Sequence, residues 1–120
     1  MALVNCETRG HVAIVTLNRP EARNAISPEV AVRLADAWRD VRDDDGVRVC
    51  IVTGTGNTFC AGADLGQLIP MMTGARKPEN EWDERVAKEP GIPARALLRN
   101  FDPVKPVIAA INGHAIAGGM

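Results

Sequence analysis

Hydrophobic and β-branched residues open the chain in two short runs, at residues 3–8 and 12–17. Arg9, Gly10 and His11 lie between the runs and form a polar connection with a glycine. Two short apolar runs around such a connection predict two strands paired as a hairpin. In this hairpin we expect His11 to face solvent.

Ser27 and Pro28 mark the start of the next predicted element. A serine at an N-cap accepts a backbone hydrogen bond, and proline at the first helical position has no N–H to leave unpaired. The apolar residues that follow recur at helical spacing: Val30, Leu34, Trp38 and Val41. This spacing predicts a helix to about residue 41 whose apolar stripe packs on a sheet.

Two later segments, at residues 47–53 and 106–111, are nearly continuous apolar runs of the kind found in buried strands. Between them, residues 67–93 are polar and irregular, which predicts a mobile loop with a short helix at 82–88. Residues 95–101 are predicted to be helical. Strands separated by long connections favour an α/β fold with a substantially parallel sheet.

Composition narrows the possible partners. The 120 residues suffice for one modest domain, and 46% hydrophobic with 24% charged residues is ordinary for a globular protein. The net charge is −1, which gives no broad attraction to nucleic acid or to an anionic membrane. Two Trp, two Phe and no Tyr leave few side chains on which bases could stack. We therefore expect neither nucleic acid nor a membrane as a partner.

The cysteines and the N-terminal residues indicate a cellular compartment. Cys6, Cys50 and Cys60 are odd in number and widely spaced, so a disulfide framework or a metal site is not expected. Free thiols suit a reducing compartment. The N-terminal residues lack a secretory pattern, and no run approaches the roughly 18 apolar residues of a membrane span. These features predict a cytoplasmic protein.

Two glycine-rich turns, at residues 54–65 and 112–119, each follow a predicted strand. Small residues let backbone N–H groups face a ligand, and a following helix N-terminus adds partial positive charge. Two such turns side by side could form an oxyanion hole, whereas one alone is more often a tight connection or a phosphate cradle. The dinucleotide fingerprint is not met because Phe59 occupies the third glycine position, and no Gly-Lys-Ser/Thr follows as a Walker loop requires.

Several short motifs occur together in a characteristic order: Asn18-Arg19-Pro20 with Asn24-Ala25, then residues 59–65, 105–113 and 117–119. In order and spacing this set resembles the enoyl-CoA hydratase/isomerase (crotonase) family over essentially the whole chain. The resemblance implies the α/β crotonase (ClpP-like) spiral of ββα units. It also implies that residues 1–120 form the N-terminal part of a single domain whose C-terminal part lies beyond this sequence.

The resemblance also implies a site for an acyl-CoA thioester. The backbone N–H groups of Ala63 and Gly118 would be the catalytic groups, because they would hold the thioester oxygen. Five further residues are expected to line the substrate site: Arg23, Ala25, Ala61, Asp64 and Leu65. Coenzyme A enters as part of the substrate, and neither a separate cofactor nor a metal is expected.

The expected reaction is that of a hydro-lyase of fatty acid metabolism, the hydration of 2-enoyl-CoA to 3-hydroxyacyl-CoA. Family members also isomerise, dehalogenate or hydrolyse acyl-CoA thioesters, and these reactions remain alternatives. So do a non-catalytic, truncated piece that binds acyl-CoA and a generic nucleotide-binding α/β module. The resemblance further implies a homotrimer or a dimer of trimers for the full-length protein.

In the hydratases of this family two glutamates transfer protons, and the first directly follows a segment that ends here at Met120. No acidic residue of the chain matches either glutamate by motif, so the 120 residues alone are expected to be inactive. Asp64 is expected to order its loop or cap a helix rather than act as a base. Cys60 is expected to be a buried thiol, and His114 a structural residue.

Overall fold

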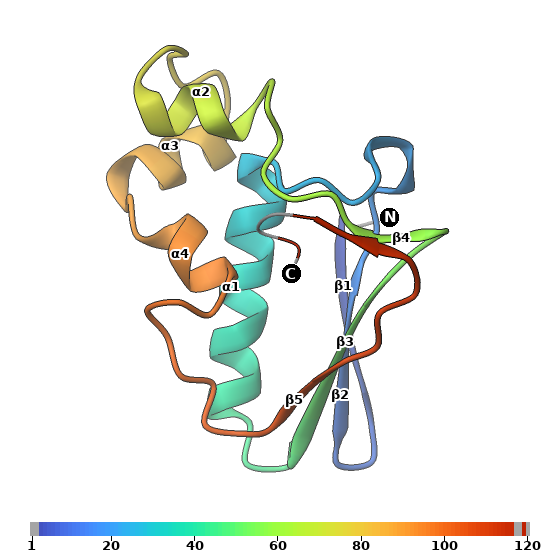
Figure 1. Ribbon diagram of the computed structural model, residues 1–120. Coiled ribbons are helices and arrows are strands. Elements are labelled where there is room, and N and C mark those ends of the chain that lie inside the picture. Colours follow the sequence, from blue (N-terminus) through green and yellow to red (C-terminus); the bar gives the residue numbers. More distant parts are fainter. Residues whose placement is uncertain (1–2, 117–118, 120) are drawn as a thin grey trace.

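A four-stranded sheet forms one layer of the computed structural model, with the strand order β1-β2-β3-β5 (Figure 1). Strand β1 (Val4–Arg9) runs antiparallel to β2 (Val12–Leu17), which confirms the predicted hairpin. Strands β3 (Val49–Gly54) and β5 (Val107–Ala109) continue the sheet parallel to β2. The largely parallel α/β sheet is therefore as predicted.

The structure describes residues 3–116 and 119, and its longest helix is α1 (Pro28–Asp43). The Ser27 hydroxyl accepts a hydrogen bond from the Val30 N–H at 3.3 Å, which confirms the predicted N-cap. All four residues of the predicted apolar stripe are buried. Figure 1 shows α1 between the sheet on one side and α3 (Glu81–Lys88) with α4 (Ile92–Ala96) on the other.

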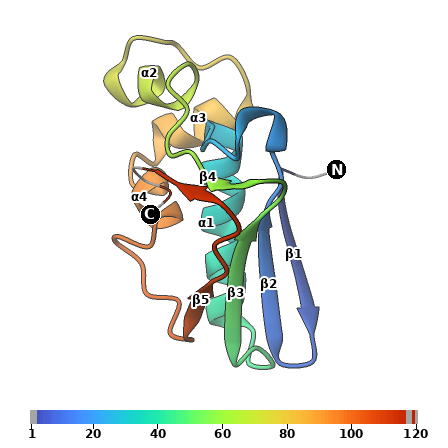
Figure 2. The ribbon, with the colours of Figure 1, turned by 45° about the vertical axis from the view of Figure 1, so that its right-hand side comes forward.

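A second, two-stranded sheet pairs β4 (Thr58–Cys60) in parallel with β6 (His114–Ala115). It lies beyond the end of β3 (Figure 2). Neither strand was predicted, because each is too short for hydrophobic periodicity to be detected. The pairing brings the two predicted glycine-rich turns side by side.

The segment predicted as an irregular loop contains more helix than expected. The helix expected at 82–88 is confirmed as α3, but α2 (Leu68–Thr73) was missed. Its six residues include a proline and are too few to show a helical period. The connection to α3 is ordered by the Arg76 guanidinium, which donates to both Asp83 carboxylate oxygens at 2.7 and 3.1 Å.

The helix predicted at 95–101 is wrong in its position. Helix α4 spans Ile92–Ala96, begins three residues earlier and ends well before residue 101. Pro93 lies in its first turn, where proline favours a helix start, and Leu98 takes a left-handed conformation with φ of 58° that stops it from continuing. The Trp38 indole N–H donates to the Ala96 carbonyl at 2.8 Å and so fixes α4 to α1.

The strand predicted at 106–111 is shorter and more exposed than expected. Only residues 107–109 form β5, and Ile108 and Ile111 are 55% and 61% exposed. A continuous apolar run predicts burial on both faces of a sheet. Within the described residues, however, β5 is the edge strand, and Ile108 points away from the cavity beside α1, because its neighbours Val107 and Ala109 line that cavity.

A largely apolar cavity of about 510 Å³ separates α1 and α4 from β3 and β5. Trp38, Phe59 and Val107 contribute to its lining, together with Gly119 at the end of the described chain. The core is therefore well filled between α1 and β2 but open beside β5. None of the helices in the described residues is long and apolar enough to cross a membrane.

Gly54, the last residue of β3, has no room for a side chain. A Cβ atom there would lie 2.6 Å from the Phe59 carbonyl oxygen and 2.9 Å from that of Thr58. We expect Gly54→Ala to lower the free energy of unfolding by about 2 kcal/mol or more, measured by urea denaturation.

Gly46→Ala is the matched control for that substitution. Its Cβ would meet only the end of the flexible Asp44 side chain, at 3.2 Å. The expected change is within about 0.5 kcal/mol. Equal destabilisation by the two substitutions would contradict the close packing described for Gly54.

Candidate functional site

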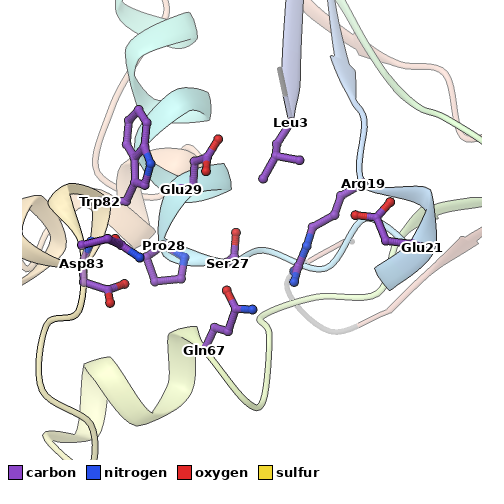
Figure 3. A pocket seen from close by; sticks show the side chains of 10 residues that line it. Leu3, Arg19, Glu21, Ser27, Pro28, Glu29, Gln67, Trp82 and Asp83 are labelled. Atoms are coloured by element: carbon purple, nitrogen blue, oxygen red, sulfur yellow. The ribbon is translucent and has the colours of Figure 1, made fainter. Parts of the chain in front are cut away.

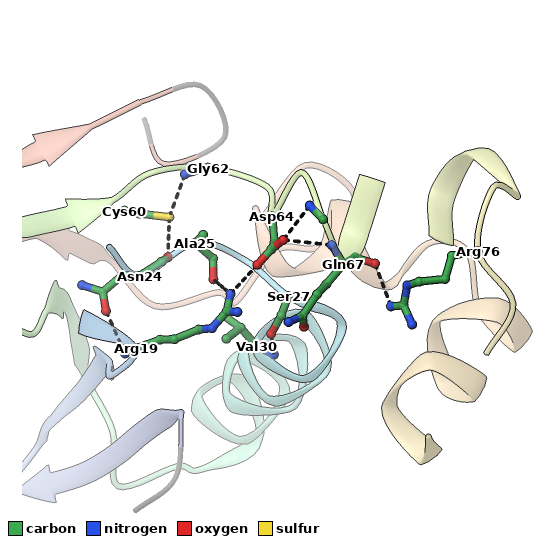
Figure 4. A network of polar contacts seen from close by, with 11 residues as sticks. Arg19, Asn24, Ala25, Ser27, Val30, Cys60, Gly62, Asp64, Gln67 and Arg76 are labelled. Carbon is green, nitrogen blue, oxygen red and sulfur yellow. Dashed lines mark hydrogen bonds and ion pairs between the residues drawn. The ribbon is translucent and has the colours of Figure 1, made fainter. Parts of the chain in front are cut away.

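Two segments that are distant in sequence lie side by side where the first predicted oxyanion turn follows β4 (Figure 4). One segment, residues 23–26, leads into α1, and the other is residues 61–64. The Ala61 N–H donates to the Arg23 carbonyl at 3.1 Å and begins the pairing. Arg23 and Ala25 are thereby brought next to the other predicted substrate-binding residues.

Ile26 holds both peptide groups that flank Ala63. Its N–H donates to the Gly62 carbonyl at 2.8 Å, and its carbonyl accepts from the Asp64 N–H at 2.9 Å. The C=O and N–H of a trans peptide point in opposite directions, so the bond to Gly62 turns the Ala63 N–H away from Ile26. Among the residues that the structure describes, none accepts a hydrogen bond from this N–H. Ala63 therefore presents a fixed and available donor.

The residue after this donor, Asp64, makes several hydrogen bonds through its carboxylate (Figure 4). One oxygen accepts from the Arg19 guanidinium at 2.7 Å. The other accepts from the N–H groups of Gly66 and Gln67 at 2.8 and 2.9 Å. The carboxylate thus orders the turn that leads into α2, as expected from the sequence.

These contacts also determine the charge state of Asp64. Burial opposes ionisation of the carboxyl, but the hydrogen bonds from Arg19, Gly66 and Gln67, with the positive charge of Arg19, outweigh it and lower its pKa. A carboxylate with a lowered pKa and occupied oxygens is a poor general base.

Asn24 is a buried hydrogen-bonding centre that belongs to one of the family motifs but has no role predicted from the sequence. Its side-chain N–H₂ lies 2.9 to 3.2 Å from the carbonyl oxygens of Thr55, Thr58 and Phe59. Its side-chain oxygen accepts from the Arg19 N–H at 2.8 Å. With φ of 57° it is left-handed, a conformation that asparagine tolerates better than most residues. An asparagine just after a proline-containing turn was therefore the sequence signal that could have indicated a structural role for Asn24.

Cys60 is a buried thiol, as expected. Its sulfur lies 3.2 Å from the Asn24 carbonyl and 3.4 Å from the Gly62 nitrogen. Burial raises the pKa of the thiol, so the neutral form predominates at neutral pH and the group is unsuited to attack a substrate.

The second predicted oxyanion turn packs directly against the first. Asn112 donates to the Gly56 carbonyl at 2.9 Å and accepts from the Gly54 N–H at 3.2 Å. The Ile116 N–H donates to the Cys60 carbonyl at 3.0 Å, and a side chain at Gly119 would collide with that carbonyl. Gly118, the second predicted donor, lies outside the described residues.

The remaining predicted residues differ in their surroundings. Leu65 is 82% exposed, and Arg23 is exposed and left-handed with φ of 54°. His114 is exposed within β6, opposite Thr58, which agrees with a structural position. Roles in substrate binding remain predictions for all five residues named for it: Arg23, Ala25, Ala61, Asp64 and Leu65.

A small pocket of about 190 Å³ lies beside Arg19, at the start of α1 (Figure 3). Its lining includes three carboxylates, from Glu21, Glu29 and Asp83. The charge of Arg19 is already paired with Asp64. Arg19 is the only cationic residue among those that line the pocket, so the pocket offers the phosphates of coenzyme A little attraction. Within the described residues no group of three potential metal ligands occurs.

The arrangement of a constrained backbone donor beside a second glycine-rich turn agrees with the family resemblance. The family model for enoyl-CoA hydratase/isomerase matches residues 7–120. The chain belongs to this family. The crotonase fold predicted from the sequence is confirmed, for the part that the chain contains, by the match to solved structures of this family.

Relatives of this family are similar along nearly the whole chain. Enoyl-CoA hydratase EchA19 of Mycobacterium tuberculosis is 43% identical in an alignment of 115 positions that covers 94% of this chain and 40% of the relative. (E)-benzylidenesuccinyl-CoA hydratase of Thauera aromatica is 39% identical, over 98% of this chain and 42% of the relative. The chain thus spans about two-fifths of the length of these relatives.

Solved structures of the enoyl-CoA hydratase/isomerase family agree with the fold. An enoyl-CoA hydratase from Mycobacterium tuberculosis H37Rv superposes with a TM-score of 0.75 at 37% identity, covering 99% of this chain and 41% of that structure. A carnitinyl-CoA hydratase from Mycobacterium avium gives a TM-score of 0.77 at 33% identity, covering 99% and 42%.

The buried Asp83 carboxylate predicts a loss of stability in acid. The hydrogen bonds from Arg76 hold the pKa of Asp83 below its ordinary value, and an unfolded aspartate titrates near 3.9. Because the unfolded chain takes up the proton first as the pH falls, this contribution is complete above about pH 4 and disappears as the pH falls through the folded pKa. Urea midpoints measured between about pH 6 and about pH 3 should therefore decline with acid.

Asp83→Asn should flatten that decline, whereas Asp45→Asn, in the exposed loop after α1, should leave it nearly unchanged. An unaltered pH profile for Asp83→Asn would contradict the role assigned to the Arg76–Asp83 pair.

Proposed function

We propose that the protein acts on acyl-CoA thioesters and catalyses the hydration of 2-enoyl-CoA to 3-hydroxyacyl-CoA. The observation that carries the proposal is the Ala63 N–H, which Ile26 orients and no described residue engages. Relatives named as hydratases of enoyl-CoA and benzylidenesuccinyl-CoA support the substrate class and the reaction.

The chemistry of hydration explains why a backbone donor matters. Water adds its oxygen to the β-carbon of the enoyl thioester, and a proton is delivered to the α-carbon. In between, negative charge collects on the thioester oxygen. A preorganised N–H at that oxygen lowers the barrier by about 3 kcal/mol. The Ala63 N–H is the proposed first donor to the thioester oxygen, and the Gly118 N–H is the proposed second donor.

The coenzyme A portion of the substrate lies along the paired segments that precede α1 and follow β4. Arg23, Ala25, Ala61 and Leu65 line its path, and backbone groups between them form the walls. Arg23 is suited to phosphate because it is exposed and, unlike Arg19, has no carboxylate partner within the described residues. Coenzyme A is the only cofactor-like group involved, and it arrives with the substrate.

Proton transfer is assigned to groups other than Asp64, whose carboxylate is bound to Arg19, Gly66 and Gln67. The family resemblance places two glutamates in these roles, the first directly after Met120. The chain described here therefore contributes the oxyanion-binding part of the reaction.

Removing the Ala63 N–H tests the proposal. Lactate incorporated in place of Ala63 keeps the side chain and replaces the N–H by an ester oxygen. In the natural polypeptide that carries this chain, crotonyl-CoA hydration, followed as loss of enoyl absorbance, should show kcat lowered about 100- to 1,000-fold. KM should change far less.

The alternatives give different results in the same assay. Binding of acyl-CoA without turnover of crotonyl-CoA would favour another family reaction or a binding role. Tighter binding of a free nucleotide than of acyl-CoA would favour a nucleotide-binding module. Unchanged kcat in the lactate variant would remove Ala63 from the mechanism.

A further inference from the structure

We propose that Arg19 and Asp64 are positioning residues for the oxyanion donor: their ion pair holds the two segments whose hydrogen bonds direct the Ala63 N–H. This inference rests on the proposed function, because it assigns the pair a purpose in holding the thioester oxygen. Neither side chain is proposed to touch the substrate.

The ion pair joins the same two segments as the two backbone hydrogen bonds of Ile26, to Gly62 and from Asp64, which together are called the Ile26 clamp. A single guanidinium nitrogen of Arg19 donates to the Asp64 carboxylate at 2.7 Å and to the Ala25 carbonyl at 3.1 Å. Asp64 directly follows Ala63 on one segment, and Ala25 directly precedes Ile26 on the other. One nitrogen atom therefore joins the two segments immediately beside the hydrogen bonds that orient the donor.

Both side chains are shielded from solvent, each with 13% of its side-chain surface exposed. Shielding strengthens the attraction between the charges, because little water lies between them to screen it. Arg19 is itself anchored, since its backbone N–H donates to the Asn24 side chain at 2.8 Å. The pair is thus tied at one end to the buried Asn24 and at the other to the turn that begins α2.

The function of such a link follows from the geometry that an oxyanion donor needs. A donor acts when its nitrogen lies about 2.7–3.1 Å from the developing oxyanion. A displacement of about 1 Å at a reacting centre can cost roughly 100-fold in rate. Loss of the ion pair leaves the two Ile26 hydrogen bonds as the main hold on the Ala63 peptide, so the N–H samples a wider range of directions.

Asp64→Asn removes the ion pair but keeps an oxygen that can accept the hydrogen bonds ordering the turn before α2. An asparagine side-chain oxygen still accepts from the N–H groups of Gly66 and Gln67, but the negative charge facing Arg19 is gone. Arg19→Met removes the guanidinium group. Arg19→Lys is the conservative variant, because it keeps a positive charge beside the Asp64 carboxylate and the Ala25 carbonyl. Asp36→Asn is the control, because it breaks a different ion pair, with Arg85 at 3.0 Å, that joins α1 to α3.

Two readouts apart from stability test the positioning role, both in the natural polypeptide that carries this chain. One is the carbonyl stretch of bound butyryl-CoA labelled with ¹³C at the thioester carbon, since this saturated thioester cannot be hydrated. The other is kcat and KM for crotonyl-CoA. Thermal unfolding of each variant is recorded beside them.

The inference predicts that Asp64→Asn and Arg19→Met lower kcat at least about tenfold, with KM changed less than about threefold. In both variants the carbonyl band returns toward the frequency of free thioester. Arg19→Lys should recover most of both losses, and Asp36→Asn should alter neither. If Asp64→Asn does not fold, the comparison of Arg19→Met with Arg19→Lys decides in the same way.

Two results would overturn the inference, and they are distinguishable. If the wild-type protein shifts the carbonyl band and the Arg19 and Asp64 variants shift it equally, with kcat within about twofold, the pair is only structural. If the wild-type protein binds the thioester without shifting its carbonyl band, the proposed oxyanion hole itself is wrong, and the positioning role is lost with it.

Discussion

The two hydrogen bonds made by the Ile26 backbone determine which way the peptide group before Ala63 faces. Because the Gly62 carbonyl is held toward Ile26, the N–H on the other side of that peptide must face away from it. Neighbouring elements hold Ile26 in the position that makes these hydrogen bonds possible. Ser27 caps α1 directly after Ile26, so the clamp is attached to the longest helix of the chain. The donor direction therefore depends on the packing of α1 on the sheet.

Polar side chains fix the segments on either side of this clamp. Asn24 satisfies carbonyls at the end of β3 and the start of β4, where regular ladder hydrogen bonding stops. Arg19 and Asp64 are brought largely out of water, which carries a desolvation cost that their mutual attraction alone need not repay. The further hydrogen bonds from Gly66 and Gln67, and to Ala25, compensate part of that cost. Groups this fully satisfied favour a single conformation of the turn.

Features with a strong local signal could be predicted from the sequence. The Ser27-Pro28 start of α1, its apolar stripe and the first hairpin each follow from capping, periodicity or turn chemistry within a few residues. Strands β4 and β6 could not be predicted, because their pairing depends on contacts across more than fifty residues. Burial of β5 was overestimated because an apolar run does not reveal that its strand lies at an edge of the described sheet. Both glycine-rich turns could be recognised from the sequence, but that they lie side by side follows from the pairing of β4 with β6.

The candidate site, too, could be predicted only in part from the sequence. The resemblance identified Ala63 by position, but the reason its N–H is available lies in a bridge to Ile26 that no local pattern encodes. The structural importance of Asn24 was missed because it arises from three carbonyls brought together only in the folded chain. Arg19 was recognised only as part of a motif, and its pairing with Asp64, 45 positions later, appears only in the folded chain.

The most direct test of the central claim observes the Ala63 amide itself. The ¹⁵N-labelled protein is titrated with butyryl-CoA and, separately, with coenzyme A lacking an acyl group, while amide proton shifts are followed by NMR. If the Ala63 N–H holds the thioester oxygen, its proton should move downfield with the thioester and stay nearly unchanged with coenzyme A alone. If amides around Arg23 and Ala61 respond to the thioester while that of Ala63 does not, the oxygen is bound elsewhere and the account is contradicted.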